Sequence, residues 1–118
     1  MNLLIVEDNP KMRQMIKSIV ADLADRIEEC DDGRDAVALY AEKKPDCVLM
    51  DIHLKKTNGI AATKEITSVF REAKIIIVTN YDDEHFRTSA REAGAFDYVL
   101  KENLLDVRRI LREVSGSD

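Results

Sequence analysis

The sequence lacks an apolar run long enough to span a bilayer, and its first residues lack the basic and then apolar layout of a signal peptide. These absences argue against a membrane protein and against export through such a signal. We therefore expect a cytoplasmic location and no contact with a membrane.

Cysteine and histidine are both scarce, with two of each in the chain. Cys30 and Cys47 fall in segments that we expect to be strands, and without a secretory signal we expect no disulfide between them. The histidines and cysteines are also too far apart to form a zinc-ligand pattern. The two cysteines are therefore interpreted as small buried hydrophobic residues.

Positive charge is in deficit, because the chain has a formal net charge of -5 at pH 7. This argues against nonspecific binding of nucleic acid or acidic membranes through this domain. The length of 118 residues suits one domain, and the sequence contains no internal repeat and no low-complexity segment. We expect one domain over residues 1–114, followed by a tail or the start of a linker at 115–118.

What the sequence does contain is a regular alternation of short apolar segments and segments of helical periodicity. The expected strands are 3–6, 26–30, 47–51, 74–79 and 96–100. The second of them is more polar than the others, so we expect it at an edge of the sheet. The expected helices are 10–23, 34–43, 59–70, 82–92 and 104–114. This alternation predicts an α/β fold with a doubly wound, five-stranded parallel sheet.

Two details of these elements are specific expectations. The helix at 10–23 carries an apolar stripe that we expect to face the core, consisting of Met12, Met15, Ile16, Ile19, Val20 and Leu23. The adjacent acids Asp31 and Asp32 precede a glycine, and we interpret them as helix-capping residues rather than as a metal site.

Four of the five expected strands end in residues that can take part in chemistry. Glu7 and Asp8 follow the first strand, and Asp51 ends the third. Thr79 ends the fourth strand, and Lys101 follows the fifth. Parallel strands bring their carboxyl ends to one edge of the sheet, which is where open α/β sheets bind ligands. We therefore expect these five side chains to converge on one pocket.

The residue types in this pocket favour phosphoryl chemistry. Clustered carboxylates repel one another unless a cation is present, and two or three oxygen ligands with remaining waters suit Mg²⁺. A carboxylate can act as a nucleophile and form an acyl phosphate, while the metal and a lysine offset the charge on the transferring group. A hydroxyl such as that of Thr79 can hydrogen-bond an incoming oxyanion.

The chain resembles the receiver domain of two-component response regulators over nearly its whole length. The matching segments are Leu3-Leu4-Ile5-Val6-Glu7-Asp8-Asn9, Val48-Leu49-Met50-Asp51-Ile52, Asn58-Gly59, Ile77-Val78-Thr79 and Ala93-Gly94-Ala95-Phe96-Asp97-Tyr98-Val99-Leu100-Lys101. Each segment is common by itself, whereas their order and spacing together are highly specific. The resemblance implies a flavodoxin-like sheet with strand order 2-1-3-4-5.

The resemblance also implies the residues of the phosphorylation site. Asp51 would be the phosphoacceptor and would take the phosphoryl group from a histidine kinase or a phosphotransfer protein. Glu7, Asp8, Asp51 and the backbone carbonyl of His53 would hold Mg²⁺, for which Mn²⁺ can substitute. Thr79 would donate its hydroxyl to the phosphoryl group, and Lys101 would pair with it.

These roles imply a signalling switch rather than an enzyme, since the chain would catalyse only its own phosphoryl transfer and autodephosphorylation. Tyr98 would be the switch aromatic, turning inward as Thr79 moves toward the phosphate. The face made by the fourth helix, fifth strand and fifth helix would then engage a partner or a second copy of the chain. We expect no direct contact with nucleic acid.

The sequence departs from the family pattern around the acceptor. Lys55 stands where the family often has proline, and Glu102 follows Lys101 where a proline with a cis bond is common, so we expect a trans bond there. Asn80 is larger than the residue usual after the threonine. His53 and Tyr81 flank the acceptor, and we hypothesise that their bulk shields Asp51 and slows hydrolysis of the acyl phosphate.

Two features of the sequence bear on how the chain would pass on its signal. The segment 101–104, which lacks proline, is similar to that of receivers joined to a helix-turn-helix output domain. Arg108, Arg109 and Arg112 form a basic face on the last helix, which is either a solvated surface or part of an output surface with the fourth helix.

The sequence argues against two other functions. A phosphatase with an aspartate nucleophile typically uses Asp-x-Asp, but the second position here is His53, which leaves no second carboxylate for acid catalysis. A flavin-binding module is disfavoured because the loop after the first strand, 7–10, is acidic and is no phosphate cradle.

Overall fold

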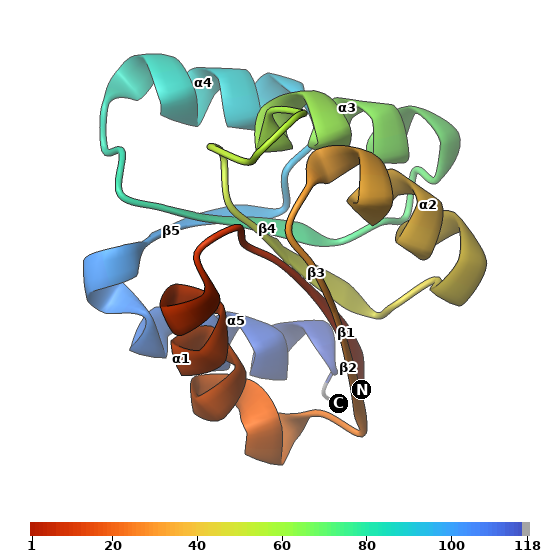
Figure 1. Ribbon diagram of the computed structural model, residues 1–118, viewed down its shortest axis with the longest axis vertical. Coiled ribbons are helices and arrows are strands. Elements are labelled where there is room, and N and C mark those ends of the chain that lie inside the picture. The colour runs from red at the N-terminus through yellow and green to blue at the C-terminus, as the bar shows by residue number, and fades with distance from the viewer. Residues whose placement is uncertain (117–118) are drawn as a thin grey trace.

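Five parallel strands form a sheet in the order β2-β1-β3-β4-β5 in the computed structural model, which describes residues 1–116 (Figure 1). The strands are β1 (Asn2–Val6), β2 (Arg26–Cys30), β3 (Cys47–Met50), β4 (Ile75–Thr79) and β5 (Asp97–Leu100). The predicted doubly wound parallel sheet and its strand order are therefore confirmed.

Five helices connect and follow these strands. They are α1 (Pro10–Val20), α2 (Gly33–Lys43), α3 (Gly59–Val69), α4 (Glu84–Glu92) and α5 (Leu105–Val114), with short 3-10 turns at Ala21–Leu23 and Lys101–Asn103. The first four helices begin behind side chains that accept hydrogen bonds from backbone N–H groups of the first turn, namely those of Asn9, Asp32, Asn58 and Asp83. These caps place the helix starts next to the carboxyl ends of the strands.

The helices cover both faces of the sheet. Helices α1 and α5 lie on one face, and α2, α3 and α4 lie on the other (Figure 1). Successive residues of β1 point to opposite faces, so that Leu3 and Ile5 belong to one core cluster while Leu4 and Val6 belong to the other. The central strands β1, β3 and β4 are therefore buried on both sides, as their apolar sequences predict.

Helix α1 differs from its prediction in two respects. Met15 does not face the core and is 51% exposed. At a turn of 100° per residue it lies roughly 90° from the middle of the stripe formed by Met12, Ile16, Ile19 and Val20. The helix also ends at Val20 and continues as a 3-10 turn through Leu23. The other boundaries match the predicted ones or differ by one residue, except that α4 begins two residues after its predicted start, and such differences are the usual uncertainty of helix and strand ends.

Several local expectations are confirmed. Both cysteines are free, with Cys47 buried and Cys30 half-buried. Gly94, which follows α4, has a φ of 96°, as expected for a left-handed helix cap. Among residues 1–116 no peptide bond is cis, which includes the bond between Lys101 and Glu102.

Over the same residues no helix is long and apolar enough to cross a membrane.

Candidate functional site

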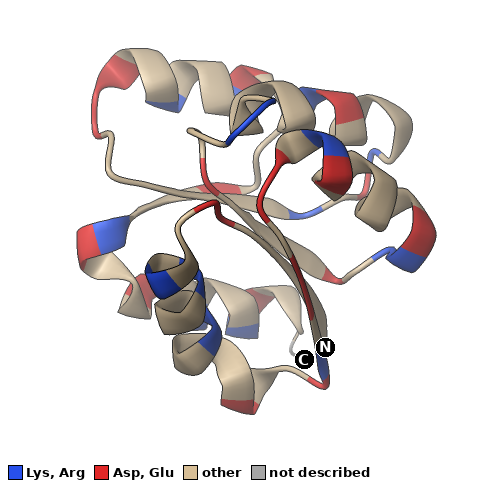
Figure 2. Cartoon of the chain, in the orientation of Figure 1, with Lys and Arg blue, Asp and Glu red and all other residues tan. Residues whose placement is uncertain are grey.

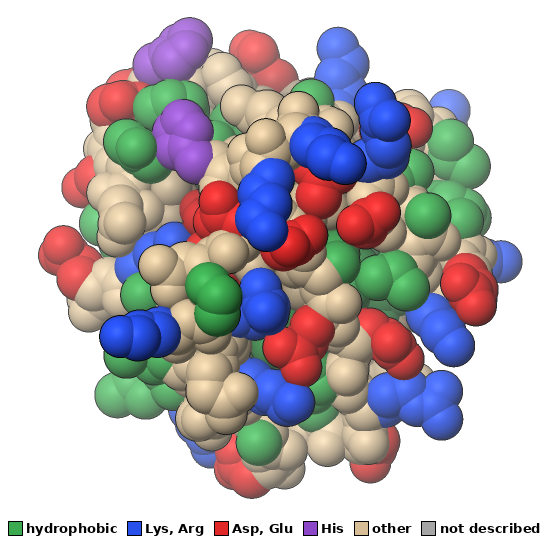
Figure 3. All heavy atoms as spheres, viewed as in Figure 1, with side chains coloured by type: hydrophobic (Ala, Val, Ile, Leu, Met, Phe, Trp, Pro, Cys, Tyr) green, Lys and Arg blue, Asp and Glu red, His purple; other side chains and the backbone are tan. Residues whose placement is uncertain are grey.

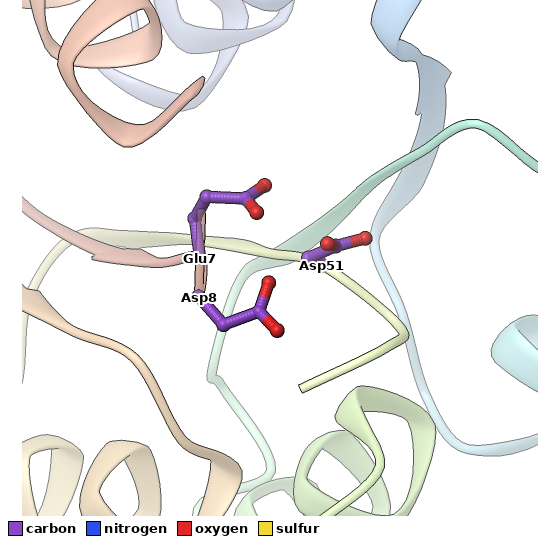
Figure 4. Close-up of side chains that lie close together, drawn as sticks. All are labelled: Glu7, Asp8 and Asp51. Carbon is purple, nitrogen blue, oxygen red and sulfur yellow. The ribbon is translucent and has the colours of Figure 1, made fainter. Parts of the chain in front are cut away.

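Three acidic side chains meet at the carboxyl edge of the sheet. One carboxylate oxygen each from Glu7, Asp8 and Asp51 lies within 4.8 Å of the others. Acidic residues follow both β1 and β3 at this edge (Figure 2), and the carboxylates of Glu7 and Asp8 extend toward the side on which Asp51 lies (Figure 4). The acids are brought together because β1 and β3 are neighbours in the sheet, with Val6 paired to Met50.

Burial makes this cluster unusual for carboxylates. Glu7 is 1% exposed and Asp51 is 6% exposed, whereas Asp8 is partly exposed. In space-filling view, acidic side chains gather near the centre of the face, with basic side chains close by (Figure 3). Buried carboxylates of like charge are costly unless a cation or hydrogen-bond donors offset them.

Lys101 supplies such a cation from the end of β5. Its ammonium nitrogen Nζ lies 2.9 Å from Glu7 Oε1 and donates a hydrogen bond to Asp51 Oδ2 at 3.1 Å. The Lys101 side chain is itself only 10% exposed. One ammonium group therefore bridges the acids of β1 and β3.

The pKa values at this site reflect burial and mutual contact. Burial raises the pKa of Glu7 above its usual range, and the charge of Asp51 adds to this, although Lys101 and the backbone N–H of Asn9 oppose it. Burial by itself lowers the pKa of Lys101, but its contacts with Glu7 and Asp51 outweigh this effect, so that the pKa is raised. The lysine is therefore held in its charged form.

The donor set fits a hard divalent cation. The three acids offer only oxygen ligands, and two of them come from adjacent residues on one strand end. Glu7 Oε1 is buried, and its contact with Lys101 lacks the alignment of a hydrogen bond. Among residues 1–116, this oxygen therefore accepts no hydrogen bond. An oxygen in this condition is available to a metal ion.

Thr79 and Tyr98 meet at the loop after β4. Thr79 is fully buried, and its Oγ1 accepts a hydrogen bond from Tyr81 N at 3.3 Å. The hydroxyl of Tyr98 donates to the carbonyl of Tyr81 at 2.6 Å, and the guanidinium of Arg87 lies 4.6 Å from the centre of the Tyr98 ring. The strand register pairs Thr79 with Leu100, the residue before Lys101.

His53, two residues after Asp51, is exposed and belongs to an aromatic cluster. Its ring lies 4.5 Å from that of Tyr81 and 6.0 Å from that of Phe86, measured between ring centres. The rings of Tyr81 and Phe86 are 5.3 Å apart. The two histidines appear near each other beside hydrophobic side chains in Figure 3. The cluster joins the loop after β3 to the start of α4.

The basic face predicted for the last helix differs in the structure at one residue. Arg108 does not face solvent as part of a basic patch with Arg109 and Arg112, because it donates hydrogen bonds to Asp22 and to the carbonyl of Ile19. It therefore fastens α5 to the end of α1.

Asp32 has a second role that its local sequence does not reveal. Asp32 caps α2 as predicted, but its Oδ1 also accepts hydrogen bonds from Lys56 N and Thr57 N, both at 2.9 Å. Asp31 pairs with Lys55 at 2.9 Å. Nothing in the local sequence distinguishes an acid that only caps a helix from one that also holds a distant loop.

Comparisons with known proteins agree on one family. The family model of the response regulator receiver domain matches residues 3–114. The chemotaxis protein CheY of Thermotoga maritima is 40% identical over 99 residues, which are 83% of this chain and 82% of CheY.

Other relatives are longer than this chain. The uncharacterized transcriptional regulatory protein YxjL of Bacillus subtilis is 34% identical over 102 residues, which are 85% of this chain and 47% of YxjL. For the regulatory protein DegU of Brevibacillus brevis the covered share is 43%. The chain thus spans a little less than half the length of these two regulators.

Solved structures give the same result. The receiver domain of a sensor histidine kinase from Pseudomonas aeruginosa PAO1 superposes with a TM-score of 0.88 at 32% identity, covering 98% of each chain. That structure has a magnesium ion coordinated in its active site cleft. A DNA-binding response regulator of the LuxR family from Staphylococcus aureus gives a TM-score of 0.88 at 28% identity, again covering 98% of each chain.

Proposed function

Because the chain belongs to the family of response regulator receiver domains, we propose that it is a phosphorylation-driven switch whose phosphoacceptor is Asp51. The phosphoryl donor would be a histidine kinase or a phosphotransfer protein. The observation that carries this proposal is the position of Asp51, which is buried at the sheet edge close to the acids that follow β1 and in contact with the ammonium group of Lys101.

The reaction would be an acyl phosphate formation at this carboxylate. A carboxylate oxygen of Asp51 attacks the phosphorus, and the bond between phosphorus and the donor's histidine nitrogen breaks. Lys101 is already in contact with Asp51 and would offset the negative charge of the transferred group. The N–H of Ile52 donates to Asp51 Oδ1 at 2.8 Å and fixes the orientation of the carboxylate.

Glu7, Asp8, Asp51 and the backbone carbonyl of His53 would hold Mg²⁺, and Mn²⁺ would substitute for it. When bound, the ion offsets charge on the phosphoryl oxygens. The acids that would bind it repel one another, so they favour a cation over an empty site. The magnesium ion in the cleft of the related histidine kinase receiver supports this assignment.

The switch would run from the phosphoryl group through Thr79 and Tyr98 to the face formed by α4, β5 and α5. Thr79 would donate its hydroxyl to the phosphoryl group, and Tyr98 would follow its movement. This face contains a hollow of about 260 Å³, lined in part by Arg87, Arg91, Tyr98 and Phe96, and Phe96 is 43% exposed. Such a surface suits a partner or a second copy of the chain.

His53 and Tyr81, whose rings contact each other, flank Asp51 in the sequence pattern and would slow hydrolysis of the acyl phosphate by restricting the approach of water. Replacing either residue by alanine is expected to shorten the lifetime of the phosphorylated form. Timing dephosphorylation after removal of the donor measures this, and an unchanged or longer lifetime would refute it.

The proposed function is tested by incubating the chain with Mg²⁺ and acetyl phosphate and measuring its intact mass. We expect the mass to rise by one phosphoryl group and the Asp51→Asn variant to show no rise. Asp35→Asn, at an exposed carboxylate in the first turn of α2, is the matched control and should behave as the wild type. Absence of the adduct in the wild type, or its presence in Asp51→Asn, would contradict the proposal.

The remaining expectations stay predictions. The chain would turn over only its own acyl phosphate, so repeated turnover of a phosphate ester would favour a phosphatase instead. A cytoplasmic location, the lack of direct nucleic-acid contact and an output domain of the helix-turn-helix class are also predictions. The same holds for a domain end at residue 114, and the last two residues of the expected tail, 117–118, lie outside the described part of the chain.

A further inference from the structure

Asp32 makes more contacts than a helix cap requires. The residue is 5% exposed, and its Oδ2 accepts a hydrogen bond from Arg34 N in α2 at 3.3 Å. Its Oδ1 accepts two shorter bonds, both of 2.9 Å, from Lys56 N and Thr57 N, which lie more than twenty residues further along the chain. One buried carboxylate therefore joins the turn before α2 to the loop after β3.

The charge of Asp32 suits this arrangement. Burial raises the pKa of a carboxyl, but the backbone N–H groups of Thr57, Lys56 and Arg34 outweigh burial, and the pKa of Asp32 lies below its usual range. The carboxylate is thus ionised at neutral pH, and hydrogen bonds to a charged acceptor are stronger than neutral ones.

Gly33, the residue after Asp32, also allows the turn before α2 to lie close to the loop after β3. A Cβ atom placed on Gly33 would lie 2.9 Å from the carbonyl oxygen of Thr57 and 3.1 Å from the Cβ of Ala62. The backbone of the turn and the backbone of the loop are therefore in direct contact, and Asp32 and Gly33 both depend on this contact.

The anchored loop is the one that follows the phosphoacceptor. It leaves the sheet at Asp51 and Ile52 and is closed where Gly59 N donates to Ile52 O at 2.7 Å. His53, whose carbonyl we assign to the metal, lies in this loop before the anchored residues. Lys55, where the family often has the rigid proline, is instead paired with Asp31 of the same turn.

We propose that Asp32 is a positioning residue that fixes the loop 53–58 and, through it, the metal site at Asp51. The inference rests on the proposed function, because the role of the loop depends on the metal assignment. Asp32 touches neither phosphoryl group nor metal, and it acts through the backbone of Lys56 and Thr57.

A simple capping role predicts different behaviour from a positioning role, and Asp32→Ser separates the two. Serine is a good helix cap but is too short to hold the loop at the same time. Asp83→Ser, at the cap of α4, is the matched control, since Asp83 accepts from Phe86 N in its own helix. Gly33→Ala is a second variant, which leaves the carboxylate intact but pushes the loop away.

Two measurements are made on each protein: amide hydrogen exchange at Lys56 and Thr57, and Mg²⁺ affinity by calorimetric titration. For Asp32→Ser and Gly33→Ala we expect exchange at these amides to become about tenfold faster or more. We expect Mg²⁺ binding to become about tenfold weaker. Asp83→Ser should match the wild type in both measurements.

Unchanged exchange in Asp32→Ser would overturn the proposal, and so would faster exchange with unchanged Mg²⁺ affinity. If Asp32→Ser does not fold, the same criteria apply to Gly33→Ala, whose helix start is not weakened. A wild type that binds no Mg²⁺ would overturn this proposal together with the metal assignment. A wild type that binds Mg²⁺ but takes no phosphoryl group would refute only the proposed function.

Discussion

At the scale of single residues, Lys101 links two buried carboxylates through one ammonium group. A charge that is buried without a partner costs several kcal/mol, while the same charge in a well-arranged pair costs little. The lysine thus makes it tolerable to bury the side chains of Glu7 and Asp51 at the edge of the core.

Replacing Lys101 by methionine, in the absence of divalent metal, is expected to lower the free energy of unfolding at pH 7 by about 3 kcal/mol. In the variant the pKa of Glu7, which burial already raises, should rise further, because its cationic partner is gone. The loss of stability in the variant should therefore shrink as the pH falls through this raised pKa, since protonation of Glu7 removes an unpaired charge. Urea unfolding at several pH values measures both effects.

Lys55→Met is the matched control for this experiment. Lys55 also forms an ion pair, with Asp31 at 2.9 Å, but its side chain is 59% exposed. Pairs of this kind contribute less than about 1 kcal/mol. Equal losses in the two variants, or a loss in Lys101→Met that does not change with pH, would contradict the explanation given for Lys101.

The two thiols are expected to be unreactive in the folded protein. Burial raises the pKa of Cys30 to about 11 and that of Cys47 to about 12. The thiolate is the reactive form, so at pH 8 each thiol should react with Ellman's reagent about a hundredfold or more slowly than an ordinary cysteine. Unfolding in guanidinium should expose two rapidly reacting thiols, and rapid reaction of either thiol before unfolding would be inconsistent with this burial.

At the scale of elements, the start of α3 packs closely against the residues that follow β3. A Cβ placed on Gly59, the first residue of α3, would lie only 1.8 Å from the carbonyl oxygen of Asp51. The start of the helix is therefore in close contact with the backbone of Asp51, and only glycine fits there.

Gly59→Ala is expected to lower the free energy of unfolding by about 1–3 kcal/mol, because the strand end and the helix start must separate. Helix propensity alone predicts the opposite sign, since alanine is the better helix former. Urea unfolding decides between these outcomes, and a variant as stable as the wild type or more stable would show that the two elements separate without cost.

Most elements could be predicted from the sequence because their residues are locally consistent. Apolar β-branched runs such as 75–78 have few alternatives to a buried strand, and Asn9 and Asp83 mark helix starts by their capping chemistry. Met15 was placed wrongly, because a residue at the margin of an apolar stripe is buried or exposed according to the neighbouring element. The second role of Asp32 was missed for a related reason, since its partners are distant in sequence.

At the scale of the whole molecule, the site exists only because the chain is wound through the sheet in one order. Glu7 and Asp8 follow β1, Asp51 follows β3 and Lys101 follows β5, yet all reach the same edge. The parallel arrangement of the strands is enough to predict that these side chains reach one edge. It is not enough to predict the distances between them. The unfolded chain separates the acids, so a cation that binds the cluster binds the folded state only.

Mg²⁺ is therefore expected to stabilise the whole fold. At a free concentration of about 100 times its dissociation constant, an ion that binds only the folded state adds roughly 2.7 kcal/mol to the free energy of unfolding. For a domain of this size the midpoint of thermal unfolding, Tm, should rise by roughly 10 °C. Thermal unfolding with Mg²⁺, and again after removal of the ion with EDTA at matched ionic strength, measures the effect.

Asp8→Asn tests whether the acidic cluster is the origin of this stabilisation. Without Mg²⁺ the variant should be at least as stable as the wild type, because one of three mutually repelling carboxylates is gone. With Mg²⁺ it should gain much less in Tm, because it has lost a charged ligand. The two proteins should thus change rank when the ion is added. An equal gain in Tm for both proteins would mean that the stabilising ion binds elsewhere on the molecule. That result would contradict the assignment of the metal to Glu7, Asp8 and Asp51.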